Sequence, residues 1–157
     1  MGEIGEVLEL LHGARCRFRT ARGAVRLRSA RDGREQVAGF SSDRSDGDDS
    51  LWRSLLDPAP WIPAFDFHVD GDAELIGRPA LRVGAVARRC DGHVRFPAEL
   101  NTAGADAYEL LVDRERGVVL RVAALADGEE LWVAELEELH FDEELRSDPF
   151  AVEARVA

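Results

Sequence analysis

The sequence of 157 residues has no lysine, and it contains only two cysteines and one tyrosine. The cysteines, Cys16 and Cys90, lack CxxC spacing and are too few for a disulfide framework. We expect two reduced, partly buried thiols, with a single disulfide between them as the alternative. No stretch reaches the roughly 18 unbroken apolar residues of a membrane helix, so no membrane span is expected. The first residues, Met-Gly-Glu-Ile-Gly-Glu, lack the basic start and apolar run of a secretory signal, which predicts a cytoplasmic protein.

Motifs of catalysis are also absent. The sequence contains no GxSxG, GxxxxGK, GxGxxG or HExxH pattern. Asp66 and Asp70 share one strand face and could act as a carboxylate pair, but pairs are common among thirty-one acidic residues. His68 and His140 could bind zinc only if the fold added a further ligand. We therefore expect no enzymatic activity, no metal and no cofactor.

Charge is the next feature that narrows the function. The net charge of −11 opposes binding to phosphate backbones, so a nucleic-acid partner is not expected. All twenty basic residues are arginine, and eight of them lie between Arg15 and Arg34. From residue 101 onward, five arginines stand against fifteen carboxylates. Either these two parts attract each other, within the fold or across a dimer, or they form solvated faces that never meet.

The last third of the chain has the clearest secondary-structure signal. Apolar and polar residues alternate over 107–113, over 118–124 and over about 130–141. The segment 113–117 and the pair Asp127-Gly128 provide turns between these runs. The pattern predicts three consecutive antiparallel strands in one open sheet.

The third of these strands predicts an irregularity. Trp132, Ala134 and Leu136 share one face of the strand, whereas Leu139 and Phe141 have the opposite parity. A bulge near residues 137 and 138 would bring all five side chains to one face and would increase the curvature of the sheet.

The rest of the chain predicts shorter elements. An apolar stripe at Ile4, Val7, Leu8 and Leu11 predicts a helix that ends at Gly13 and packs on the sheet. Further expected elements are strands at 15–20, 25–28, 65–70 and 81–87, a turn at 71–72, a brief strand at 74–76, a helix at 51–56, an extended proline-rich segment at 58–63 and a long connection at 88–106. The segment 41–50 has no hydrophobic residue and is expected to be a mobile loop; its spacing does not fit a calcium loop.

Aromatic residues provide the candidate site. Several fall on the apolar faces of the predicted strands, and others flank the proline-rich segment. Packed together, they form an ordinary core; left partly open, they line an apolar cleft on the concave face of the sheet. The expected ligand-binding residues are Trp52, Trp61, Phe65, Phe67, Trp132 and Phe141.

Three short segments resemble a known family. They are Gly-Arg-Pro-Ala-Leu-Arg-Val at 77–83, the hairpin Leu-Val-Asp…Gly-Val-Val-Leu-Arg within 111–121, and the ending from Phe141 to the Asp-Pro-Phe at 148–150. Together with the order of the elements, they resemble the LolA-like outer-membrane lipoprotein carriers and the sigma-factor regulatory proteins of the RseB/MucB type. The resemblance spans about residues 65–150. It implies an open antiparallel half-barrel covered by helices, with a hydrophobic cavity for acyl chains and no catalytic residue.

The sequence and the resemblance together predict one α+β domain over residues 1–157. Its expected architecture is an open, strongly curved antiparallel sheet, with an N-terminal helix and a short second helix over the concave face. The expected function is non-enzymatic binding of a lipid or acyl ligand, or of a protein partner, on that face. The alternative is a cytoplasmic interaction or regulatory module with a fully packed core and no small-molecule ligand. The sequence does not predict the oligomeric state.

Overall fold

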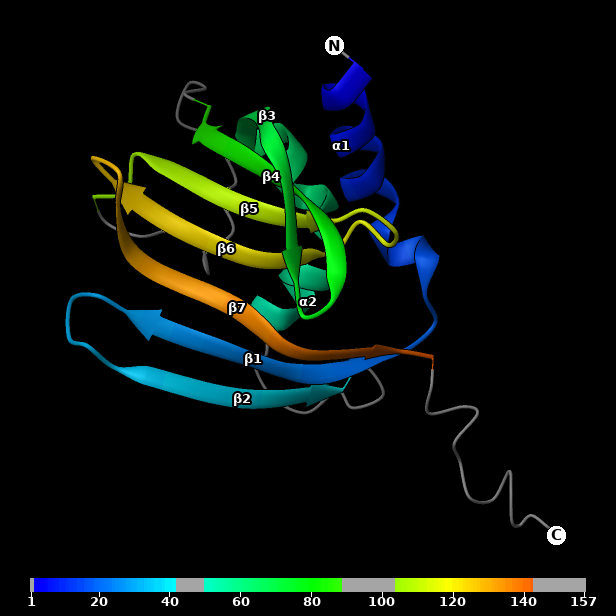
Figure 1. The fold of residues 1–157 in the computed structure, drawn as a ribbon, viewed down its shortest axis with the longest axis horizontal. Coiled ribbons are helices and arrows are strands. Elements are labelled where there is room, and N and C mark those ends of the chain that lie inside the picture. Colours follow the sequence, from blue (N-terminus) through cyan, green and yellow to red (C-terminus); the bar gives the residue numbers. More distant parts are fainter. Residues whose placement is uncertain (1, 42–49, 89–103, 143–157) are drawn as a thin grey trace, which may run out of the picture.

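A computed structural model describes residues 2–41, 50–88 and 104–142 of the chain. Seven antiparallel strands form a single open sheet in the order β2-β1-β7-β6-β5-β4-β3 (Figure 1). The strands are β1 (Ala21–Ser29), β2 (Glu35–Ser41), β3 (Phe65–Leu75), β4 (Arg78–Ala87), β5 (Ala107–Asp113), β6 (Val119–Ala126) and β7 (Glu129–Phe141). The helical elements are the α-helices α1 (Gly2–Gly13) and α2 (Ser50–Leu56), and the 3-10 helices η1 (Ala14–Arg17) and η2 (Ala59–Ala64). The expected α+β class with an open, curved antiparallel sheet is confirmed.

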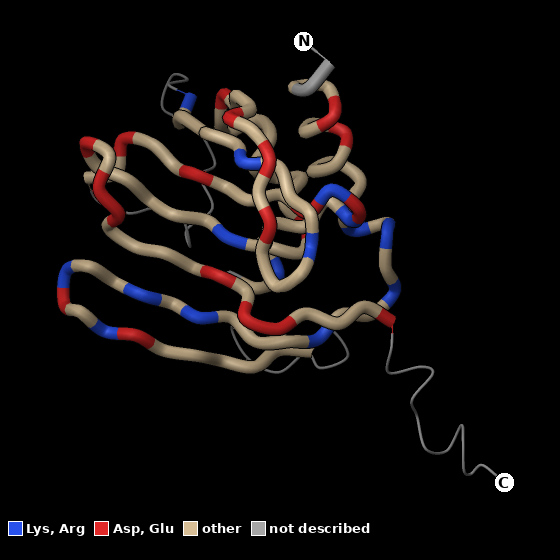
Figure 2. Tube along the Cα trace, in the orientation of Figure 1, with Lys and Arg blue, Asp and Glu red and all other residues tan. Residues whose placement is uncertain are grey.

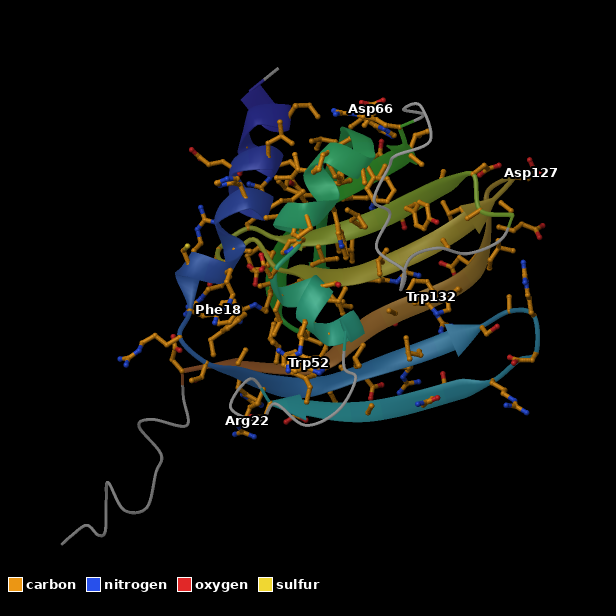
Figure 3. The ribbon with its side chains drawn as sticks, turned by 180° about the vertical axis from the view of Figure 1, so that it is seen from behind. Phe18, Arg22, Trp52, Asp66, Asp127 and Trp132 are labelled. Atoms are coloured by element: carbon orange, nitrogen blue, oxygen red, sulfur yellow. The ribbon has the colours of Figure 1, made fainter. Side chains whose placement is uncertain are left out.

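The three strands predicted in the last third are β5, β6 and β7, and each pairs with the next. Alternation predicted these strands because one face of the sheet packs against the helices. The opposite face carries the charged pair Glu109 and Arg121 among apolar residues such as Ala123. Figure 3 shows the helices on one side of the sheet. On that side the core includes Leu110, Val122 and Ala134 from the three central strands, all at most 2% exposed.

The predicted bulge in β7 is confirmed. Ala24 of β1 pairs with Glu138, but the next residue, Val25, pairs with Leu136, so Glu137 is the extra residue. Leu136, Leu139 and Phe141 consequently all belong to the buried core. A Cβ atom at Gly23, beside the bulge, would lie 2.0 Å from the carbonyl oxygen of Glu138. Glycine is therefore required there for the two strands to approach each other.

The strand expected at 15–20 is wrong. Residues 14–17 form η1, and the polypeptide becomes extended only at Phe18. Tertiary contacts override the local alternation: the Arg17 guanidinium donates to the carbonyl of Leu10 at the end of α1, and Arg116 donates to the carbonyl of Arg17. The second N-terminal strand is instead β2, at residues for which no strand was predicted. Cys16 on η1 is a free thiol, but it is exposed, so the expected partial burial is wrong for this residue. Cys90 lies outside the described residues.

Two expectations in the middle of the chain are also wrong. The proline-rich segment is not extended but forms η2, in which the N–H of Trp61 donates to the carbonyl of Pro58 at 2.8 Å. Burial of Trp61 against the core favours this compact turn. The expected turn at 71–72 is a bulge inside the continuous strand β3, where the pairing shifts between Val69 and Gly71. Gly71 permits the bulge because its φ is 142°.

The two predicted α-helices are confirmed, whereas the two long connections are mostly untested. The helices predicted at the N-terminus and at 51–56 are α1 and α2, and α1 packs beside β3, β5 and η2. Most of the predicted loop at 41–50 and of the connection at 88–106 lies outside the described residues.

The arginine-rich and acidic parts of the chain meet inside the fold. Strand β1 pairs with β7, and Figure 2 shows arginines of the first beside acidic residues of the second. Arg26 of β1 forms ion pairs with Glu137 of β7 and with Glu35 of β2. The first of the two interpretations of the charge distribution therefore holds for this pair of strands.

Candidate functional site

The six predicted aromatic residues do not gather in one cleft. Trp61 and Phe65 are at most 1% exposed and belong to the core, as do Trp52 and Phe141. Phe67 and Trp132 are partly buried and pack against that core. In Figure 3, Trp52 lies on α2 whereas Trp132 lies on the sheet, well away from it. Their role in ligand binding stays a prediction.

Contacts among these rings show how the inner face is filled. The Phe65 ring lies 5.9 Å from that of Phe67 and 5.3 Å from that of Tyr108. The Phe141 ring lies 5.0 Å from that of Phe18. Such centroid distances are typical of packed aromatic pairs. In the described part of the chain, the helix-covered face is thus occupied by its own side chains.

A groove lies at the margin of this packed face, between η1 and α2. It has a volume of about 340 Å³ and we call it the Trp52 groove. Its lining includes Arg15, Phe18, Trp52, Arg53, Leu56, Asp57 and Pro60. Figure 3 shows Phe18 and Trp52 on neighbouring elements. The groove therefore combines an apolar floor with charged groups, and among the six predicted residues Trp52 lies in it.

Two guanidinium groups lie over the aromatic rings of this groove. Arg15 lies 5.2 Å from the Phe18 ring centroid and Arg53 lies 4.9 Å from the Trp52 ring centroid. Cation–π attraction holds both cations against the rings. Both side chains are exposed, and neither forms an ion pair with another described residue. Each guanidinium thus keeps its fork of N–H donors available for a carboxylate.

Trp52 also has a buried polar group. Its ring stacks on Phe40 of β2 at 5.1 Å with an interplanar angle of 13°, which fixes its orientation. The buried indole Nε1–H has no acceptor among the residues that the structure describes. A buried N–H without an acceptor costs roughly 1–3 kcal/mol. An acceptor that reaches this atom would remove that cost.

Sequence reasoning missed Arg15, Phe18 and Arg53. Arg15 and Phe18 were assigned to a strand, in which they would lie on opposite faces. On η1 and the residue that follows it, the spacing of three places both beside α2. Arg15 and Phe18 are three residues apart, which is the period of a 3-10 helix, and this spacing was the signal that could have predicted their common side.

Two other hollows have charged linings. One, of about 310 Å³, lies at the β1–β2 hairpin and includes Arg28, Arg34 and Trp132. The other, of about 500 Å³, lies between Ile76 at the tip of the β3–β4 hairpin and the β1–β7 pair, where Arg26 and Glu137 are already paired. Neither hollow has as many apolar side chains as the Trp52 groove.

The residues considered for metal binding or catalysis form separate local pairs and do not share one site. His68 lies 3.4 Å from Asp70 on β3, whereas His140 lies 3.1 Å from Glu138 on β7. Asp66 forms an ion pair with Arg88, with 2.8 Å between Oδ1 and Nε. Over residues 2–41, 50–88 and 104–142, no three or more His, Cys, Asp or Glu side chains converge as a metal site.

Comparison with known proteins gives similarity in structure but not in sequence. No protein-family model and no curated protein sequence matches the chain. A crystal structure of MucB matches over 90% of this chain, with a TM-score of 0.53 and 19% identity. The chain has the MucB fold. The RseB/MucB resemblance inferred from the sequence is thus confirmed at the level of the fold.

The chain spans about 60% of the length of that MucB chain. The complex of MucA and MucB from Pseudomonas aeruginosa matches over 89% of this chain and 57% of the other, with a TM-score of 0.53 and 18% identity. A putative outer membrane lipoprotein-sorting protein domain from Vibrio parahaemolyticus covers 94% of this chain and 97% of its own, at 9% identity. The TM-score of this match is 0.36. None of the helices described here is long and apolar enough to cross a membrane.

Proposed function

We propose that this chain is a non-enzymatic binding module whose Trp52 groove receives an apolar segment of a protein partner that carries a carboxylate. The observation that supports this most is the pair of exposed guanidiniums, Arg15 and Arg53, held over the rings of Phe18 and Trp52. Apolar side chains of the partner would be removed from water against Trp52, Leu56 and Pro60. Its carboxylate would accept charge-assisted hydrogen bonds from the arginines.

The proposal agrees with the packing of the inner face. Because Trp61 and Phe65 are fully buried, a partner is expected at the margin of the core rather than inside it. The MucB fold also occurs in a complex with another protein, MucA, which supports a protein as the occupant. The proposed binding site is therefore the Trp52 groove, whereas the sequence predicted a site in the middle of the concave face.

A second candidate ligand is an acyl chain with a free carboxylate. A volume of about 340 Å³ lies within the range of roughly 300–1,000 Å³ typical of small-molecule pockets. The same apolar floor and guanidinium pair would bind it. The lipid or acyl ligand expected from the sequence is thus retained as the alternative occupant.

Titration followed by tryptophan emission tests both candidates. The probes are a capped nonapeptide of alternating leucine and aspartate, the same peptide with arginine in place of aspartate, and dodecanoate. We expect the acidic peptide to give a saturable change that is lost in Trp52→Phe, and the basic peptide to give none. Saturation by dodecanoate alone would support the acyl candidate, and no saturable change with any probe would refute the site.

Charge reversal on the groove provides the matched control. Arg53→Glu should weaken binding of the acidic peptide by about tenfold or more, because the substitution removes a charge-assisted hydrogen bond and adds repulsion. Arg82→Glu makes the same change of charge on the exposed surface of β4, outside the groove. Its affinity for the acidic peptide should stay within about twofold of that of wild type. Equal weakening by both variants would show that only long-range charge matters.

A further inference from the structure

The two edges of the sheet differ in how they are protected against pairing with another strand. The β3 edge carries a bulge between Val69 and Gly71, and Asp66, Asp70 and Asp72 lie along it. Bulges and charged side chains are common means of blocking an edge. By contrast, β2 pairs with β1 without any shift in register and contains no proline and one charged residue, Glu35.

The exposed part of β2 is also apolar. Residues 35–39 are all exposed, and Val37 is 52% exposed, more than any other large hydrophobic residue of the described chain. Beside it, Ala38 and Gly39 add little side-chain volume. An unblocked edge of this kind is a template for strand addition.

Backbone hydrogen bonds at the end of β1 determine which backbone groups of β2 point outward. Ala30 donates to the carbonyl of Leu131 on β7, and Ser29 donates to the carbonyl of Arg34. Because the bonding direction alternates along an antiparallel ladder, Arg28 bonds toward β7 and not toward its β2 partner, Glu35. The N–H and C=O groups of Glu35 therefore point to the open edge. By the same alternation, so do those of Val37 and Gly39.

We propose that β2 pairs antiparallel with β2 of a second copy of this chain, with Val37 on the two-fold axis. In this register Val37 faces Val37 of the second copy, and Glu35 faces Gly39. The outward-pointing groups of the three residues then bond reciprocally. The two sheets join into one continuous sheet, and the interface is isologous.

The sequence of β2 makes it complementary to itself. No like charges face each other in this register, because the one charged residue lies opposite a glycine. A Cβ atom placed on Gly39 meets only the Gly23 carbonyl oxygen, at 3.7 Å, so this position has room for the facing Glu35. The two valines bury each other at the centre, which favours a second copy over an unrelated peptide.

The dimer should be weak, and its association should become stronger as the salt concentration rises. One strand pair lies at the small end of interface sizes, below about 1,200 Å². Each copy carries a net charge of −11, so screening of the mutual repulsion should strengthen association as salt rises. An interface held by ion pairs would show the opposite trend.

Sedimentation equilibrium of the full chain over a range of concentrations tests the proposal. We expect wild type to dimerise and Val37→Lys and Val37→Glu each to be monomeric, because like charges would meet on the axis. An equimolar mixture of the two variants should recover the dimer, since lysine would face glutamate. Val86→Lys, at a position 46% exposed on β4, is the matched control and should dimerise as wild type does.

Several results would overturn the proposal. A wild type that stays monomeric up to its solubility limit would refute it, as would dimerisation of Val37→Lys at wild-type strength. Failure of the mixed variants to associate would exclude Val37 from the axis. Circular dichroism melting of each variant establishes that the monomers are folded, which is expected because Val37 is more than half exposed.

Discussion

The Arg78 Nε atom lies 2.5 Å from Asp113 Oδ2, and the Asp113 side chain is completely buried. Arg78 begins β4 and Asp113 ends β5, so this ion pair joins the β3–β4 hairpin to the β5–β6 turn. The other carboxylate oxygen of Asp113 accepts a hydrogen bond from the N–H of Glu115 at 2.8 Å. These are residues of two of the segments that suggested the family resemblance. The two segments thus meet in space and stabilise one corner of the sheet.

Removal of Asp113 should be strongly destabilising. Asp113→Ala removes the buried partner of Arg78, leaving it with only the exposed Glu115 among the described residues, and removes the turn hydrogen bond, so we expect a loss of about 3–5 kcal/mol in the free energy of unfolding. Asp113→Asn keeps an acceptor and should cost less. Urea unfolding measures both variants. Glu115→Ala, whose side chain is 68% exposed, should change stability by less than about 0.5 kcal/mol; a similar loss there would contradict the assignment.

Gly117 should tolerate no side chain because α1 lies against it. A Cβ atom there would lie 2.1 Å from the carbonyl oxygen of Leu10. Gly128 has nearly the same φ, 83° against 79°, but a Cβ atom placed on it would have no neighbouring atom within 4 Å. We expect Gly128→Ala to cost about 1–2 kcal/mol from conformation alone, and Gly117→Ala to cost clearly more. Thermal melting of the two variants compares them, and equal costs would show that α1 does not pack as described.

The bulge in β7 should depend on Gly23. An alanine Cβ would overlap the Glu138 carbonyl, so Gly23→Ala should force the strands apart and cost about 1–3 kcal/mol. Gly39→Ala, on the neighbouring strand, makes only an ordinary contact and should be nearly neutral. Chemical denaturation in dilute solution measures both. If Gly23→Ala were neutral, the register on either side of Glu137 would have to be different.

Asp142 should make stability depend on acid pH. Hydrogen bonds from the N–H groups of Thr20 and Arg19, together with the nearby Arg116 charge, hold the pKa of Asp142 below its usual value. Since the folded-state pKa is lower than the unfolded one of ~3.9, its stabilisation is fully present above that pH and is lost as pH falls through the folded pKa.

The variant Asp142→Asn isolates this effect and keeps a residue that tolerates the φ of 57° at this position. It should be less stable than wild type at pH 7, and the difference should shrink as pH falls below about 4. Unfolding curves at several pH values measure it. A difference that does not depend on pH would rule out the carboxylate as the source.

Local pattern was sufficient where a strand has one apolar and one polar face. The runs that became β5, β6 and β7 were identified for this reason, and parity predicted a bulge near residues 137 and 138, where the structure has it. The pattern failed where contacts distant in sequence decided the conformation. Residues 15–20 alternate as a strand would, but residues 14–17 form a 3-10 turn. Arg116, ninety-nine residues away from Arg17 in sequence, donates to the Arg17 carbonyl and helps to hold that turn.

The candidate site was predicted only in part for the same reason. Trp52 was expected to bind a ligand, and it lies in the groove, but Trp61 and Phe65 became core. Aromatic residues with an apolar periodicity are compatible with either outcome. Only the covering of the sheet by α1, α2 and η2 decides which rings keep an exposed edge.

By itself, the sequence determined the antiparallel strands of the last third, the bulge and the two α-helices, because alternation and turn residues act over a few neighbours. The tertiary structure decided which edge of the sheet is left unblocked, how η1 and α2 form a groove, and how Arg78 reaches Asp113. These depend on segments brought together from distant parts of the chain, and no local pattern records which segments will become neighbours.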